Sequence, residues 1–228
     1  MHLGLLFIIV LSLYLASLLI GFWLGKKGTL DIVWWLERKK RRTFLTDPLT
    51  VRIHQWLDKY KMSSLKHKKW FRFGLLIFLN NLLLVAFISR TLYGIIFVIP
   101  LFLTIWGGLW QGVSFSNPLV AKPLGSKLDV KPVLTGVFEF GGYIVATVGG
   151  VNFGLSFFKN SQNVVASLVV ALKDLVYIYP VVVLFLLLGA YFETSLIKSS
   201  APKMDSGLDF DMEKARKLAL QMLQNKQG

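Results

Sequence analysis

Residues 3–24 read LGLLFIIVLSLYLASLLIGFWL, a run of 22 residues without a single charged side chain. A helix needs about 20 apolar residues to cross the ~30 Å hydrocarbon core of a bilayer. No basic residue precedes the run and no small-residue cleavage site follows it, so we expect a retained transmembrane helix rather than a signal peptide.

Four further apolar runs follow along the chain. They cover residues 73–89, 92–113, 132–158 and 175–196, and Arg90-Thr91 is expected to form the tight turn between the first two of them. Each run is long enough to cross a bilayer as a helix. The sequence therefore predicts an all-α fold, a polytopic transmembrane helix bundle of about five spans with amphipathic helices on the cytoplasmic side.

A shorter apolar segment, 163–172, stands before the last run and ends at Lys173-Asp174. As a separate sixth span, 163–175 would be too short for ~30 Å of hydrocarbon, and it would move the basic C-terminal tail to the outer side. We therefore favour an interfacial or re-entrant helix on the outer side. The alternative is one long tilted helix over 163–196.

The composition excludes several classes of protein. The chain has 228 residues, 26 Lys and Arg against 12 Asp and Glu, and a mean hydropathy of +0.59, which is too high for a soluble or disordered chain. In a soluble protein the net charge of +14 would suggest nucleic acid, but beside apolar spans it indicates anionic lipid headgroups, so no nucleic-acid partner is expected. The absence of cysteine excludes disulfides, thiolate catalysis and iron–sulfur sites. The three histidines lie outside the apolar runs, so we expect no metal and no cofactor.

Charge also predicts the orientation of the spans. With the N-terminus outside, 23 of the 26 Lys and Arg residues fall on the cytoplasmic side, as the positive-inside rule requires. We therefore predict a multi-pass protein of the plasma membrane with its C-terminus in the cytoplasm. Its four parts are an N-terminal transmembrane helix, a basic cytoplasmic loop with an amphipathic helix, a transmembrane bundle and a cytoplasmic tail helix, at residues 1–24, 25–72, 73–197 and 198–228.

The cytoplasmic segments carry patterns of their own. A basic run in the first loop is expected to contact anionic lipid headgroups, at ~1 kcal/mol per residue, through Arg38, Lys39, Lys40, Arg41 and Arg42. Thr46-Asp47-Pro48 begins an amphipathic helix of about three turns, which lies on the membrane surface or docks on a cytoplasmic partner. In the tail, 198–208 is typical of a linker and 209–225 of a second helix.

The fourth run carries the strongest constellation of polar and small residues. Small residues recur every four positions and form one stripe, at Gly142, Ala146, Gly150 and Gly154. A neighbouring helix can approach closely along such a stripe. Glu139 and Thr135 lie on the same face, so the Glu139 carboxyl is expected to point into the bundle. An ionisable group in a span marks a functional site by default, and the alternative is that Glu139 only links two helices by hydrogen bonds.

The second run carries two neighbouring amides at its middle, Asn80 and Asn81. An amide in a span can bond across helices, at ~0.6 to 2 kcal/mol. We predict that these amides bond to Glu139, or to Gln111 and Thr104 of the third run.

The third and fifth runs add weaker signals. Gly108 and Gly112 form another pair of small residues at helix–helix spacing, and Pro100 is expected to kink the third helix. Glu193 stands at the cytoplasmic end of the fifth run, where its carboxylate is expected to reach the interface at little cost.

Several of these motifs together resemble the integral-membrane family of stage II sporulation protein M. The similarity covers about residues 70–198 and rests on Asn80-Asn81, on Gly107-Gly108-x-x-x-Gly112, on Thr135-Gly136-Val-Phe-Glu139-Phe and on Leu188-Gly-Ala-Tyr-Phe-Glu193. One position departs from the family, since Thr135 stands where the family often has His. The resemblance implies a non-catalytic membrane subunit, because the named member belongs to a cell-wall-remodelling complex, while some relatives are regarded as permease-like.

Two functions from different classes follow. The first is a non-enzymatic subunit that scaffolds or positions the partners of a membrane complex, with the bilayer, other subunits or further copies of itself as partners. The alternative is a permease-like subunit with a polar path near Glu139 and Asn80 and an ATPase on another chain. An intramembrane enzyme has the weakest support, because a lone carboxylate without a partner or a metal is a poor catalyst.

Overall fold

The computed structural model describes residues 3–26, 48–116, 130–159 and 164–204. Over these ranges the chain is helical, with no strand. Five helices there are long and apolar enough to cross a membrane. The predicted all-α bundle of about five spans is therefore confirmed.

Four of the five spans are continuous α-helices. They are α1 (Leu3–Lys26), α5 (Val98–Ser116), α7 (Val130–Lys159) and α8 (Val164–Met204). The second span is built from three pieces in series, namely α4 (Trp70–Leu79), the π-helix η1 (Asn80–Thr91) and the short 3₁₀-helix η2 (Leu92–Ile95). The amphipathic helix α3 (Pro48–Lys66) precedes the second span and packs on α4.

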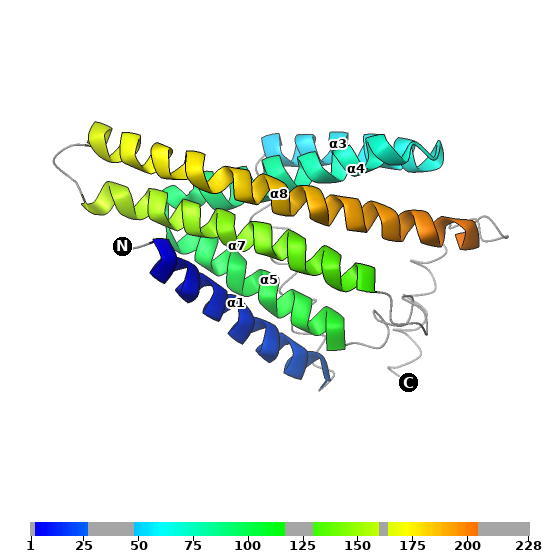
Figure 1. Ribbon diagram of the computed structural model, residues 1–228, viewed down its shortest axis with the longest axis horizontal. Helices are drawn as coiled ribbons and strands as arrows, with labels where there is room; N and C mark the ends of the chain where they lie inside the picture. Colours follow the sequence, from blue (N-terminus) through cyan, green and yellow to red (C-terminus); the bar gives the residue numbers. More distant parts are fainter. Residues whose placement is uncertain (1–2, 27–47, 117–129, 160–163, 205–228) are drawn as a thin grey trace.

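Helix α7 lies at the centre of the bundle and contacts α1, α5, α8, η1 and η2 (Figure 1). On one side it buries an apolar cluster with α1, made by Leu6, Val10 and Tyr14 of α1 against Ile144 and Val148 of α7. On the other side Ala146 packs with residues of η1 and α8 in a second cluster. The central position of α7 explains why its sequence is rich in small residues, since it has neighbours on several sides.

Helices α1 and α5 pack almost backbone to backbone. A side chain at Gly108 would collide with Ser17 and the Tyr14 backbone, and one at Gly112 would collide with the backbone of Leu18. Only glycine allows this approach. The predicted pair of small residues therefore lies at a helix–helix contact, and its partner is the first span.

The small-residue stripe of α7 serves two neighbours. Gly142 lies against Leu186 of α8, whereas Gly150 and Gly154 lie against the backbone of the second span, near Arg90 and Gly94. One straight stripe can meet two elements because α8 and the second span both pack on α7 and contact different residues of the stripe.

The last span differs from the favoured expectation of a re-entrant helix at 163–175. Helix α8 runs without a break over 41 residues, from Val164 to Met204. At ~1.5 Å per residue it is about 60 Å long, twice the hydrocarbon thickness. The alternative of one long helix is correct, and the predicted linker at 198–208 is wrong over its first seven residues, because the helix continues through them.

The turn between the second and third spans also differs from the prediction. Arg90 and Thr91 are helical, and the chain turns between Ile95 and Val98. Pro100 consequently lies in the first turn of α5, where helical N–H groups have no intrahelical partner. It replaces no helical hydrogen bond there, so the predicted kink is wrong.

A turn of defined geometry joins α3 to α4. Lys68 has a φ of 53°, a left-handed conformation that is uncommon for a residue with a side chain. The Lys69 N–H donates to the Ser64 carbonyl over 2.9 Å, and the Lys68 N–H donates to the Leu65 carbonyl over 3.0 Å. This pair of bonds is a Schellman motif, which closes α3 and reverses the chain. Helix α3 begins at Pro48, as predicted, but it has 19 residues and is therefore longer than the predicted three turns.

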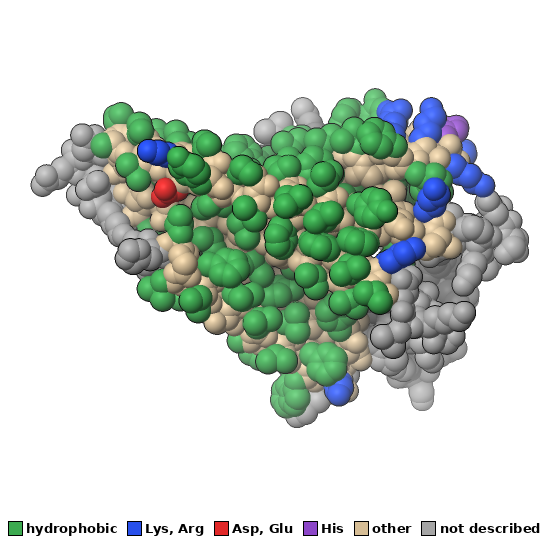
Figure 2. Space-filling view, in the orientation of Figure 1, with side chains coloured by type: hydrophobic (Ala, Val, Ile, Leu, Met, Phe, Trp, Pro, Cys, Tyr) green, Lys and Arg blue, Asp and Glu red, His purple; other side chains and the backbone are tan. Residues whose placement is uncertain are grey.

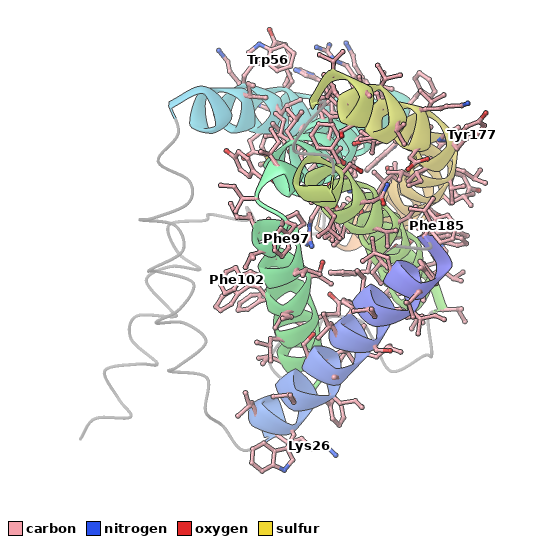
Figure 3. The ribbon with its side chains drawn as sticks, turned by 90° about the vertical axis from the view of Figure 1, so that its left-hand side faces the viewer. Lys26, Trp56, Phe97, Phe102, Tyr177 and Phe185 are labelled. Atoms are coloured by element: carbon pink, nitrogen blue, oxygen red, sulfur yellow. The ribbon has the colours of Figure 1, made fainter. Side chains whose placement is uncertain are left out.

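The outer surface of the bundle is apolar along its flank and basic at one end (Figure 2). Phe102 of α5 and Tyr177 of α8 point outward on opposite sides of the bundle, and their side chains are exposed (Figure 3). The turn between α3 and α4, with exposed Lys66, Lys68 and Lys69, marks what we call the basic end. Exposed apolar flanks of this kind are typical of a surface in contact with lipid.

Two predicted segments lie outside the described residues. They are the basic run over Arg38, Lys39, Lys40, Arg41 and Arg42 and the tail helix over 209–225.

Candidate functional site

Polar side chains gather at three levels inside the bundle. Near the basic end lies the carboxyl cluster, which consists of Asn80, Asn81, Glu139 and Glu193. Farther along lies the arginine cluster, which consists of Arg90, Thr104 and Thr147. Toward the opposite end Asn152 of α7 donates to Asp174 of α8 over 2.8 Å.

The carboxyl cluster joins the second, fourth and fifth spans. Asn81 Nδ2 donates to Glu139 Oε1 over 2.7 Å, although 58 residues separate the two in sequence. Asn80 Nδ2 in turn donates to Asn81 Oδ1 over 3.2 Å. The predicted bond between the asparagine pair and Glu139 is therefore present.

The second carboxyl of the cluster comes from α8. Glu193 lies within hydrogen-bonding reach of Glu139. A hydrogen bond between two carboxyl groups needs a proton on one of them, because an ionised carboxylate has no donor. Helix α8 continues past Glu193 to Met204, and the Glu193 carboxyl lies beside α7. That it also reaches the membrane interface stays a prediction.

A glycine in α8 makes room for this contact. A Cβ atom at Gly189 would lie 2.6 Å from Glu139 Cγ and 3.2 Å from the Glu139 backbone nitrogen. Any larger residue at position 189 would push α7 and α8 apart and separate the two carboxyls. Lys61 of α3 interacts electrostatically with Glu193 and also pairs with Asp58 over 3.0 Å.

The arginine cluster surrounds a guanidinium that is only 6% exposed. Arg90 Nη1 donates to Thr104 Oγ1 over 2.6 Å and to Thr147 Oγ1 over 3.3 Å. Its Nη2 donates to the Leu103 carbonyl over 3.0 Å, and its Nη1 also reaches the Pro100 carbonyl over 3.3 Å. Every one of these acceptors is uncharged, so among the described residues hydroxyl and carbonyl oxygens hold the cation.

Tyr143 lies between the two clusters. It follows Glu139 by four residues on α7, and its ring centroid is 5.9 Å from Arg90 Cζ. Tyr14 of α1 closes the same place from the other side, together with Phe140. The space that they line with Arg90 does not admit a water molecule. The polar groups here are therefore packed against one another.

Other predicted site residues lie apart from the clusters. Thr135 Oγ1 donates to the carbonyl of Lys131 within its own helix. The Gln111 amide likewise lies outside the clusters, beside Gly136. By contrast, Thr104, which was predicted as a partner of the asparagine amides, belongs to the arginine cluster. No group of three or more His, Cys, Asp or Glu that could hold a metal occurs among the described residues.

Arg90 is the residue that sequence reasoning missed. A lone arginine between two apolar runs is read as the turn between them. Gly94 and Pro100 were the stronger turn signals, because these residue types break helices. Both residues come after Arg90 in the sequence. A turn predicted from them would therefore have placed Arg90 inside the span.

No family model matches the chain, and neither the curated proteins nor the solved structures contain a match. A function for the chain is therefore proposed from the residues and their arrangement.

Proposed function

We propose that this multi-pass membrane protein is a non-enzymatic subunit that positions the partners of a membrane complex, and that it is a relative of stage II sporulation protein M. What supports the proposal is the carboxyl cluster. Asn80-Asn81, Glu139 and Glu193 each belong to a different motif of that resemblance, and they meet at one place.

The cluster suits a structural platform. Hydrogen bonds between side chains of different spans fix the mutual position of helices in lipid, where water does not compete for them. The second, fourth and fifth spans are held in this way, while α1 is held to α5 by close backbone packing. A rigid bundle with exposed apolar flanks is what a partner in the membrane needs as a docking surface.

The test is recovery of partners from native membranes. The tagged full chain is purified in mild detergent and its companions are identified by mass spectrometry. Envelope proteins at near-equal amounts are expected with the parent and with Val137→Leu, a lipid-exposed control on the same helix. Glu139→Leu is expected to lose them, because Asn81 and Glu193 are left without their partner. A chain that purifies alone under these conditions would contradict the scaffold.

One observation favours the permease-like alternative. Ionisable and amide groups follow one another along the bundle, from Lys61 and Glu193 through Glu139 and Arg90 to Asp174. Polar residues in spans commonly mark ion or proton pathways. In this alternative the tightly packed carboxyl and arginine clusters are the closed state of the path, and transport requires them to separate.

The alternative is tested by proton flux into liposomes that contain the purified chain and a pH-sensitive dye. A transporter should show flux under an applied potential that falls at least about tenfold in Glu139→Gln, because the amide carries no exchangeable acid proton. Equal flux for the parent, Glu139→Gln and empty liposomes would exclude a proton path through this chain in the absence of an ATPase subunit.

A further inference from the structure

A groove runs along the outer face of the bundle between α4 and α8. It encloses about 480 Å³. Its walls are apolar over most of its length, with Phe71, Leu75 and Phe78 from α4 and Leu187 from α8. Phe71 is 87% exposed, so this wall faces outward from the bundle.

The groove has a polar end. Thr194, Ser195 and Lys198 of α8 line it there, beside Trp70 at the first residue of α4. Lys198 is exposed, as are Lys69 and Arg72 next to Trp70. The polar end of the groove therefore lies at the basic end of the bundle, where an indole ring also suits the lipid headgroup region.

The length of the groove matches one leaflet of a bilayer. From Trp70 to Phe78 a helix rises about 12 Å, and from Leu187 to Lys198 about 16 Å. Half of the ~30 Å hydrocarbon core is about 15 Å. A groove that begins at the headgroup level and ends near the bilayer middle fits the acyl chain of a lipid in that leaflet.

Charge decides which kind of lipid fits. Lys198 stands at the mouth of the groove. Of the described acids near this end, Asp58 already pairs with Lys61, and Glu193 faces Glu139 inside the bundle. A zwitterionic headgroup brings its own cation, whereas an anionic phospholipid supplies the negative charge that the basic end lacks. Basic pockets between spans on this side are a known kind of lipid site.

We propose that the α4–α8 groove binds one anionic phospholipid of the leaflet at the basic end, with an acyl chain along Phe71, Leu75 and Leu187 and its phosphate at Lys198. The proposal is independent of whether the chain is a scaffold or a permease, because it concerns the outer face and not the polar clusters.

The headgroup is tested by native mass spectrometry of the full chain after exchange into phosphatidylglycerol or phosphatidylcholine. We expect one retained lipid per chain, with about fivefold preference for phosphatidylglycerol from a single lysine. Lys198→Gln should lose that preference. Lys173→Gln, an exposed lysine at the opposite end of the same helix, should keep it. Equal retention of both lipids by the parent, or an unchanged preference in Lys198→Gln, would overturn the proposal.

The acyl-chain contact has its own matched pair of variants. Leu75→Trp fills the groove and should remove most of the retained lipid, because the indole ring occupies the space of the acyl chain. Leu83→Trp, which is equally exposed on the same span but outside the groove lining, should not. A photoreactive side chain at position 75 should label lipid in native membranes. If the photoreactive side chain labels a protein and no lipid, a partner helix occupies the groove and the proposal is overturned.

Discussion

Glu139 is the residue on which three spans depend. Its carboxyl accepts from Asn81, meets Glu193, and packs against the backbone space left by Gly189. A buried polar group is costly when it loses its partner, and removal of one member leaves the others unsatisfied. For stability, a hydrogen-bond acceptor at position 139 is therefore more important than a charge there.

Two substitutions separate these contributions. Glu139→Gln keeps an oxygen for Asn81 and is expected to change the free energy of unfolding by less than about 1 kcal/mol. Glu139→Leu leaves Asn81 without an acceptor and is expected to cost about 1–3 kcal/mol. Thermal unfolding in detergent measures both. Equal loss of stability in the two variants would show that the hydrogen bond from Asn81 contributes little.

Arg90 depends on the shape of its guanidinium. It reaches the two threonines and the Leu103 carbonyl at once, which a single ammonium group at the end of a lysine cannot do. Arg90→Lys is therefore expected to lower the free energy of unfolding by about 1–3 kcal/mol although the charge is kept. Arg72→Lys, at an exposed arginine of the same span, should stay within about 0.5 kcal/mol in the same unfolding assay. A loss in Arg72→Lys as large as in Arg90→Lys would refute this account.

Among the elements, the π-helix η1 explains how the second span places its polar residues. Asn80 and Asn81 are its first residues and Arg90 is its last but one. Thr91 and Ser89 donate to carbonyls five residues back, which follows the wider turn of this helix. The wider turn changes the direction of Arg90 around the helix axis relative to Asn81. Both side chains can therefore point into the bundle, at different levels along it. π-Helical turns are rare and often occur at functional sites.

The turn between α3 and α4 offers a test at the same scale. Lys68 adopts a left-handed φ that glycine adopts without steric cost. Lys68→Gly is therefore expected to raise the free energy of unfolding by about 0.5–1 kcal/mol. Lys66→Gly, two residues earlier and inside the helix, should lower it by about 0.5–1 kcal/mol. A decrease in both variants, measured by the unfolding temperature, would contradict the motif.

For the whole molecule, the distribution of charge predicts which end faces the cytoplasm. The α3–α4 turn carries exposed lysines, while Lys173 and Asp174 stand near the start of α8, at the opposite end. From the positive-inside rule we predict that the basic end faces the cytoplasm.

This orientation can be tested directly because the chain has no cysteine of its own. In intact cells, Lys173→Cys should react with a membrane-impermeant maleimide. Lys66→Cys should react only after the membrane is permeabilised. Both positions are exposed, so access to the reagent is limited by the membrane alone. The reverse labelling pattern would invert the topology and move the lipid groove to the other leaflet.

The sequence by itself determined the class of fold and the number of spans. Leu3–Leu24 and the other apolar runs decide that the chain crosses a membrane, because in lipid the backbone must satisfy its own hydrogen bonds and a helix does so locally. The sequence also predicts a bond from the asparagine pair to Glu139 as one of two alternatives, since an amide and a carboxyl in apolar runs have few other places to bond.

Only the tertiary structure decided which residues meet. Glu193 joins Glu139 because α8 continues through residues 163–175 and sets the register of its glycine against α7. Arg90 enters the core because η1 carries the span past it to Ile95. Both outcomes depend on contacts between spans distant in sequence. The apolar pattern of a single span indicates that it lies in the membrane. It does not indicate which face of the span contacts which neighbouring helix.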